Sequence, residues 1–115
     1  NYEKGYAAAQ RLLESASPPD AIFCADDVIA MATMDFARYK LNLRIPEDLS
    51  VIGFDDIPPA ARPNYELTTI RQPFNRLVDS TLDTLFEAIN TPAGKVIEKT
   101  VPPTLTWRNS VRRKE

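Results

Sequence analysis

The sequence predicts an α/β fold: a doubly wound, mostly parallel sheet whose strands alternate with helices. Two short apolar runs, Ala21–Ala25 and Leu49–Phe54, lack polar alternation and therefore fit strands that are covered on both faces. Between them, Val28–Lys40 has apolar residues at helical spacing. A strand, a helix and a strand in this order form a βαβ unit, whose crossover is right-handed in nearly all proteins.

A further helix is expected before the first strand, over residues 5–16. Its apolar residues recur at steps of three and four, and Pro18 and Pro19 then prevent it from continuing. We interpret this helix as the end of an earlier βα unit whose strand lies upstream of Asn1. In the Val28–Lys40 segment, Asp26 or Asp27 is a natural N-cap, and Asn42 fits a left-handed position after its end.

The second half of the chain continues with a β segment over 67–72. Pro73 then opens a helix that runs to Ile89 and carries a strong apolar stripe. Alternation over 96–100 indicates an edge strand, residues 104–108 indicate a last strand, and the tail 112–115 is expected to be disordered.

Composition excludes several classes of catalytic and metal site. The 115 residues include no histidine and one cysteine, so a Ser-His-Asp triad, a Cys-His dyad, an imidazole metal site and an internal disulfide are ruled out. With 14 basic and 16 acidic residues, the net charge of −2 offers no basic stripe for nucleic acid. No apolar run is long enough to cross a membrane.

Pairs of acids follow both predicted parallel strands. Asp26 and Asp27 come after the first strand, and Asp55 and Asp56 come after the second. In open α/β sheets, ligands bind outside the carboxyl ends of the strands. Carboxylates at that edge can accept hydrogen bonds from the hydroxyl groups of a sugar or nucleoside, and they can equally hold a magnesium ion.

Some of these acids can instead have a purely structural role. Asp27 can simply cap the helix, and Asp56 can simply be a turn acid. Asp55 is the leading candidate for a ligand contact, because it lies directly at the strand end.

Gln72 and Phe74 flank Pro73, where a strand becomes a helix. An amide and a flat ring at this point suit a polar ligand with a ring, although Phe74 can instead pack in the core. Cys24 and Trp107 are expected in the core, and Arg108 is a candidate to tie the last strand to a carboxylate.

Four strings together resemble the carboxyl-terminal part of the lac-repressor (LacI/GalR) family of transcription regulators. They are PPDAIFCADDVIAMATMDFARYK, LRIPEDLSVIGFDD, LTTIRQPFNRLVDSTLDTL and PPTLTWRNS, and the resemblance runs from about Gly5 to Ser110. It implies part of a periplasmic-binding-protein-like (type I) core, in which a small effector, a sugar or a purine-like metabolite, binds between two subdomains. A protein of this kind binds and switches, and it is not an enzyme.

The resemblance also implies which residues meet the effector. Asp55, Asp26, Gln72 and Phe74 match the family's ligand-contact positions, whereas no catalytic residue, metal site or cofactor is implied. Asp26 departs from the Asn or Ser that is usual in the family, which is compatible with a different ligand polarity or with a purely capping role.

The implied organisation divides the chain into three parts. Residues 1–70 belong to the carboxyl-terminal effector-binding subdomain, and 71–101 are a crossover helix and strand of the amino-terminal subdomain. Residues 102–115 return to the carboxyl-terminal subdomain and form the tail. The chain is then a piece of a longer cytoplasmic, homodimeric repressor that binds operator DNA through a helix-turn-helix absent from this chain, with no membrane contact. In such a piece, we expect the 74–89 helix to fold back on the sheet, pair with another copy or exchange between chains.

Two other functions remain open at this stage. A sugar-binding transport protein shares the fold. A magnesium-dependent phosphoryl-transfer enzyme would use Asp26, Asp27, Asp55 and Asp56.

Overall fold

The structure, a computed structural model, describes residues 1–113. The chain divides into two compact units. The first contains Asn1–Arg71 and the segment from Leu105 onward, and the second contains Gln72–Thr104.

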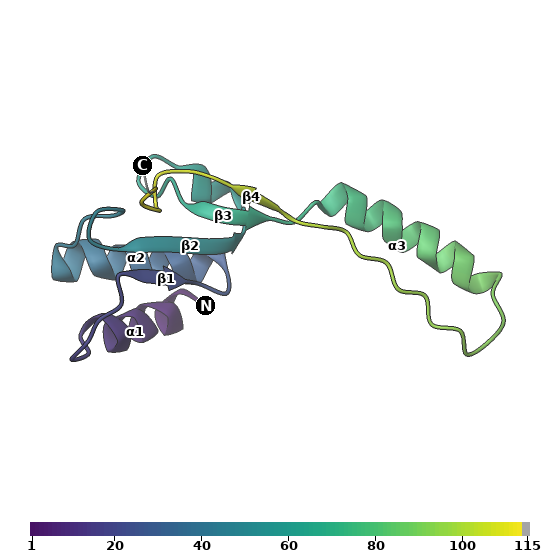
Figure 1. Ribbon diagram of the computed structural model, residues 1–115, viewed down its shortest axis with the longest axis horizontal. Helices are drawn as coiled ribbons and strands as arrows, with labels where there is room; N and C mark the ends of the chain where they lie inside the picture. The colour runs from purple at the N-terminus through teal and green to yellow at the C-terminus, as the bar shows by residue number, and fades with distance from the viewer. Residues whose placement is uncertain (114–115) are drawn as a thin grey trace. The chain divides into compact units, whose positions relative to one another are not determined.

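The sheet has four strands in the order β1-β2-β3-β4 (Figure 1). They are β1 (Ala21–Phe23), β2 (Ser50–Asp55), β3 (Thr68–Arg71) and β4 (Thr104–Thr106). β1 pairs in parallel with β2, and β2 pairs in parallel with β3, where Asp55 lies opposite Arg71. The predicted α/β class with a mostly parallel sheet is therefore confirmed.

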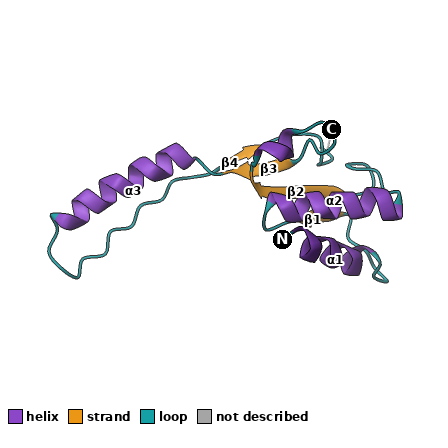
Figure 2. Ribbon diagram, turned by 180° about the vertical axis from the view of Figure 1, so that it is seen from behind, coloured by secondary structure: helices purple, strands orange, loops and turns teal. Residues whose placement is uncertain are grey.

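Among the described residues, the first unit contains two α-helices, and α2 (Asp27–Leu41) covers one face of the sheet (Figure 2). α2 starts at the N-cap Asp26 and ends at Asn42, whose φ of 53° confirms the predicted left-handed cap. α1 (Tyr2–Leu13) packs closely on α2. The two backbones are so near that a Cβ on Gly5 would lie 3.0 Å from the Cα of Ile29.

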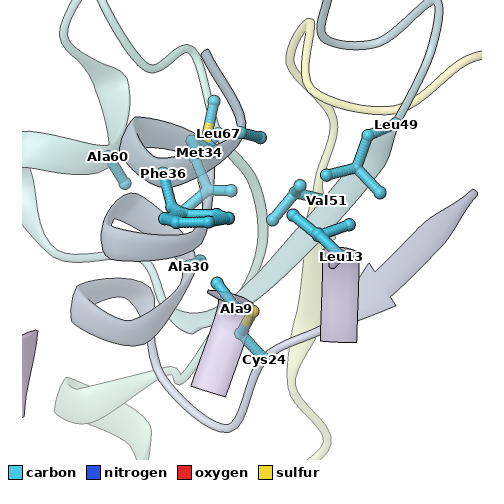
Figure 3. Packing of buried hydrophobic residues seen from close by; sticks show 11 residues of the cluster. Ala9, Leu13, Cys24, Ala30, Met34, Phe36, Leu49, Val51, Ala60 and Leu67 are labelled. Atoms are coloured by element: carbon cyan, nitrogen blue, oxygen red, sulfur yellow. The ribbon is translucent and has the colours of Figure 1, made fainter. Parts of the chain in front are cut away.

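The core lies between α2 and the sheet. Its largest fully buried apolar side chains are Met34 of α2, Leu49, Val51 of β2 and Leu67 (Figure 3). Fully burying one such side chain stabilises a fold by about 1.5–3 kcal/mol. Cys24 belongs to this cluster at 3% exposure, as expected.

The second unit contains α3 (Phe74–Ile89) and the extended segment after it. Within this unit Lys99 Nζ lies 3.0 Å from Glu87 Oε2. No residue of α3 is buried in the described chain, so its apolar stripe is exposed. Folding back onto the sheet would bury this stripe, and this expectation stays a prediction. Pairing with a second copy and exchange between chains stay predictions.

Several predicted elements need correction. The first helix begins earlier than residue 5, because the Asn1 side chain accepts a hydrogen bond from the Lys4 amide at 3.0 Å and caps it. The strand expected over 96–100 does not form, since a strand requires a neighbour to complete its hydrogen-bond ladder and alternation alone supplies none.

The carboxyl-terminal segment also differs from expectation. Trp107 is 51% exposed rather than in the core, and the Arg113 guanidinium lies 5.2 Å from its ring centroid. In the tail expected to be disordered, the Arg112 amide donates to Ser50 Oγ at 3.1 Å. Residues 114–115 of that tail lie outside the described residues.

Candidate functional site

The candidate site lies at the carboxyl ends of the parallel strands. Asp26 and Asp27 follow β1, while Asp55 ends β2 and Asp56 comes next. Because β1 and β2 are parallel, both acidic pairs belong to the same edge of the sheet.

Asp26 is the N-cap of α2. Its Oδ1 accepts a hydrogen bond from the Ile29 amide at 2.7 Å, and the side chain is partly exposed. The capping alternative considered for this residue is therefore confirmed. A ligand contact by Asp26 stays a prediction.

Asp27 is completely buried and forms a structural link between three elements. Its Oδ1 accepts from Thr69 Oγ1 of β3 at 2.5 Å, and its Oδ2 accepts from the Ile57 amide at 2.9 Å. Burial raises the pKa of this carboxyl. Gly53 makes room for it, because a Cβ there would lie 2.2 Å from Asp27 Oδ1.

The chain turns sharply after β2. Asp55 has a φ of 119° and Asp56 a φ of 57°, although neither is glycine. Conformations of this kind cost about 1–3 kcal/mol per residue and persist only where the surroundings hold them. The turn leads into a short 3₁₀ helix, η1 (Pro58–Ala61).

Asp56 is held by two guanidinium groups. Its Oδ1 accepts from Arg108 Nη2 at 2.6 Å, and its Oδ2 lies 3.2 Å from Arg71 Nε. The Asp56 side chain is only 4% exposed, so its structural role is confirmed. The bond from Arg108 to Asp56 confirms the predicted tie of Arg108 to a carboxylate. Arg108 also donates to the Leu67 carbonyl at 2.7 Å.

Gln72 and Phe74 belong to the second unit, whereas Asp26 and Asp55 belong to the first. Phe74 is 64% exposed, so the alternative that it packs in the core is wrong for the described chain. The structure brings Asp27 together with the turn that carries Asp55, and it assigns Gln72 and Phe74 to the other unit.

Thr69 of β3 lies at this edge of the sheet, and its role there was not predicted from the sequence. A signal was available, because a threonine in an apolar strand needs a hydrogen-bond partner for its hydroxyl when it is buried. Thr68 and Thr69 are both fully buried. Thr68 Oγ1 accepts from the Arg108 amide at 3.0 Å, and Thr69 donates to Asp27.

The acids do not form a metal centre. Within residues 1–113, no group of three or more His, Cys, Asp or Glu side chains is placed to hold a metal ion. Asp27 uses both oxygens internally, and Asp56 faces two arginines. These contacts compete with the magnesium coordination for which the phosphoryl-transfer alternative would use Asp27 and Asp56. In the same residues, no helix has the length and apolar character needed to cross a bilayer.

The chain is similar to known proteins over nearly its whole length. Residues 1–111 match the family model described as periplasmic binding protein-like domain. The HTH-type transcriptional repressor PurR of Erwinia tasmaniensis is 37% identical over 109 residues, which are 95% of this chain and 32% of that protein. The chain therefore spans about a third of the length of this relative.

Solved structures of regulators have the same fold. A LacI transcriptional regulator from a Rhodococcus species superposes with a TM-score of 0.84 at 26% identity, over 96% of this chain and 40% of that one. A LacI family regulator from Lactobacillus casei with bound sucrose superposes with a TM-score of 0.76 at 26% identity, over 96% and 41%.

Proposed function

Because the chain belongs to the family of periplasmic binding protein-like domains, we propose that it is the effector-binding and dimerisation portion of a bacterial transcriptional repressor. The predicted resemblance to LacI/GalR regulators is confirmed by relatives that are named as repressors. These names are not those of enzymes, in agreement with the prediction that the chain is not one.

The observation that carries the proposal is the turn after β2. It presents Asp55 at the carboxyl edge of parallel strands, from a left-handed backbone held by buried contacts. A carboxylate there accepts hydrogen bonds from ligand hydroxyls, so we assign Asp55 as the principal contact and Asp26 as a second one. Gln72 and Phe74, which belong to the second unit, stay predicted effector contacts on the basis of the family resemblance.

The proposed effector is a small polar metabolite, with a sugar as the first choice and a purine-like compound as the second. The sucrose bound to the Lactobacillus casei regulator supports the first choice. The same fold in a sugar-transport protein is the alternative function. The repressor names of the relatives favour regulation over transport.

The remaining partners follow from this role. We propose a cytoplasmic homodimer that uses α2 and the loop 57–65, where Tyr39 of α2 is 75% exposed. Operator DNA would be bound by a helix-turn-helix outside this chain. An effector that binds two core arrangements unequally would then change DNA affinity by the same coupling free energy.

A ligand screen tests the proposal. The natural protein that contains this chain is titrated by calorimetry with glucose, sucrose and adenine, and the Asp55→Ala variant is titrated with any compound that binds. Loss of one or more hydrogen bonds to a charged acceptor predicts about tenfold or greater weakening with the fold intact. Equal affinity of the two proteins would remove Asp55 from the site, and a failure of all three compounds to bind would contradict the proposed effector class.

A further inference from the structure

We propose that Asp27 is a positioning residue that holds the turn after β2 and thereby sets the direction of Asp55. Asp27 itself makes no contact with the effector. The inference rests on the proposed function, because Asp55 is the effector contact whose geometry Asp27 would determine.

The need for such a residue comes from the backbone of the turn. Asp55 and Asp56 are consecutive residues with positive φ, at 119° and 57°. Left-handed conformations are unfavourable for residues with a Cβ, and two in succession require contacts on both sides of the turn. On the strand side, Asp55 is paired in the β2–β3 ladder opposite Arg71.

The contact on the far side comes from Asp27. The Ile57 amide donates to Asp27 Oδ2 at 2.9 Å, directly after the two strained residues. Thr69 Oγ1 orients the same carboxylate by donating to Oδ1 at 2.5 Å, and the side chain is completely buried. Both oxygens are therefore engaged inside the protein, which makes Asp27 unsuited to contacting a ligand.

Asp56 supplies a further restraint in the middle of the turn. Its side chain is fixed between Arg108 and Arg71. The restraint from Asp27 differs because it links the turn to a helix: Asp27 is the first residue of α2 and follows the N-cap Asp26. Through Asp27, the start of α2 and the turn carrying Asp55 form one rigid edge, so the two proposed effector contacts are fixed relative to each other.

Nuclear magnetic resonance of the 115-residue chain tests this role without any effector. In Asp27→Ala the Ile57 amide loses its acceptor, so its hydrogen exchange should accelerate about tenfold or more, and the φ of Asp55 should leave the positive region. Asp27→Asn should keep the native φ, because an amide oxygen can still accept from Ile57. Asp26→Ala is the matched control, since it removes a cap from the same helix and leaves the turn bonded.

If Asp27→Ala does not fold, Asp27→Ser takes its place, because its shorter side chain keeps a polar group and is too short to replace the carboxylate. A native Asp55 φ in the Ala or Ser variant overturns the proposal. An equal change in Asp26→Ala also overturns it, because the effect would then come from general loss of stability. The ligand screen with Asp55→Ala decides the proposed function separately, so the two failures are distinguishable.

Discussion

Asp56 and Arg108 form a buried ion pair at this edge of the sheet, and its role is structural. The Arg108 side chain is 19% exposed and that of Asp56 is 4% exposed, and their closest atoms lie 2.6 Å apart. A pair so well removed from water is costly to break, because the remaining charge stays buried without compensation.

Removing the arginine should therefore destabilise the chain strongly. We expect Arg108→Gln to lower the free energy of unfolding by about 3–5 kcal/mol in urea denaturation. Arg11→Gln, at an exposed position of α1, should change it by about 0.5 kcal/mol or less. Similar losses for both variants would show that the Asp56–Arg108 pair is not the buried link described here.

Asp27 makes the stability of the fold depend on pH. Its folded pKa is raised above the unfolded value by burial. Protonated Asp27 therefore favours the folded state below the unfolded pKa of about 4, and this contribution is lost as the pH rises through the raised folded pKa.

Asp27→Asn removes this titration. The free energy of unfolding of the wild type minus that of Asp27→Asn should fall as the pH rises from 4 to 7. Urea denaturation of both proteins at several pH values measures the difference. A difference that stays constant or rises with pH would contradict the raised pKa.

At the scale of elements, α2 is defined by its two caps. Asp26 Oδ1 accepts from the Ile29 amide, and Asn42 takes the left-handed conformation at the other end. Both ends were predictable from sequence, because capping depends on local residue types. The role of Asp27 was not predictable, since its partners Ile57 and Thr69 lie 30 and 42 residues away.

The caps provide a direct test. Asp26→Ala should lower the free energy of unfolding by about 1 kcal/mol, because the Ile29 amide loses its partner. Asn42→Gly should have little effect or stabilise slightly, since glycine also adopts a positive φ. Thermal unfolding followed by circular dichroism compares them, and a larger loss for Asn42→Gly would contradict the assigned caps.

The edge strand expected over 96–100 shows where sequence patterns fail. Alternation describes how side chains would be arranged in a strand, but the backbone also needs a neighbouring strand. The parallel strands β1 and β2 were predictable as strands from their continuous apolar runs. Coverage on both faces is wrong for β1 in the described residues, because Ala21 and Phe23 are exposed, Phe23 at 62%.

At the scale of the whole chain, the two units differ in how deeply their apolar side chains are buried. Leu49 of the first unit is 1% exposed, whereas Leu85 of the second is 54% exposed. Apolar area removed from water is the main source of stability, so the first unit should account for most of the free energy of unfolding.

Matched truncations test this difference. Leu49→Ala should cost about 2–5 kcal/mol, as buried leucines do. Leu85→Ala should cost less than about 1 kcal/mol, because half of its side chain is already in water and alanine favours helix. Equal costs in urea denaturation would show that α3 is buried in solution.

The central claim is that Asp55 contacts a small effector while Asp27 holds Asp55 in place. A crystal structure of the natural protein that contains this chain, with its effector bound, tests this claim most directly. We predict an effector hydroxyl or amide within hydrogen-bond distance of the Asp55 carboxylate, with Asp27 still bonded to Ile57 and Thr69. An effector that lies beyond hydrogen-bond reach of Asp55, or that bonds directly to Asp27, would contradict it.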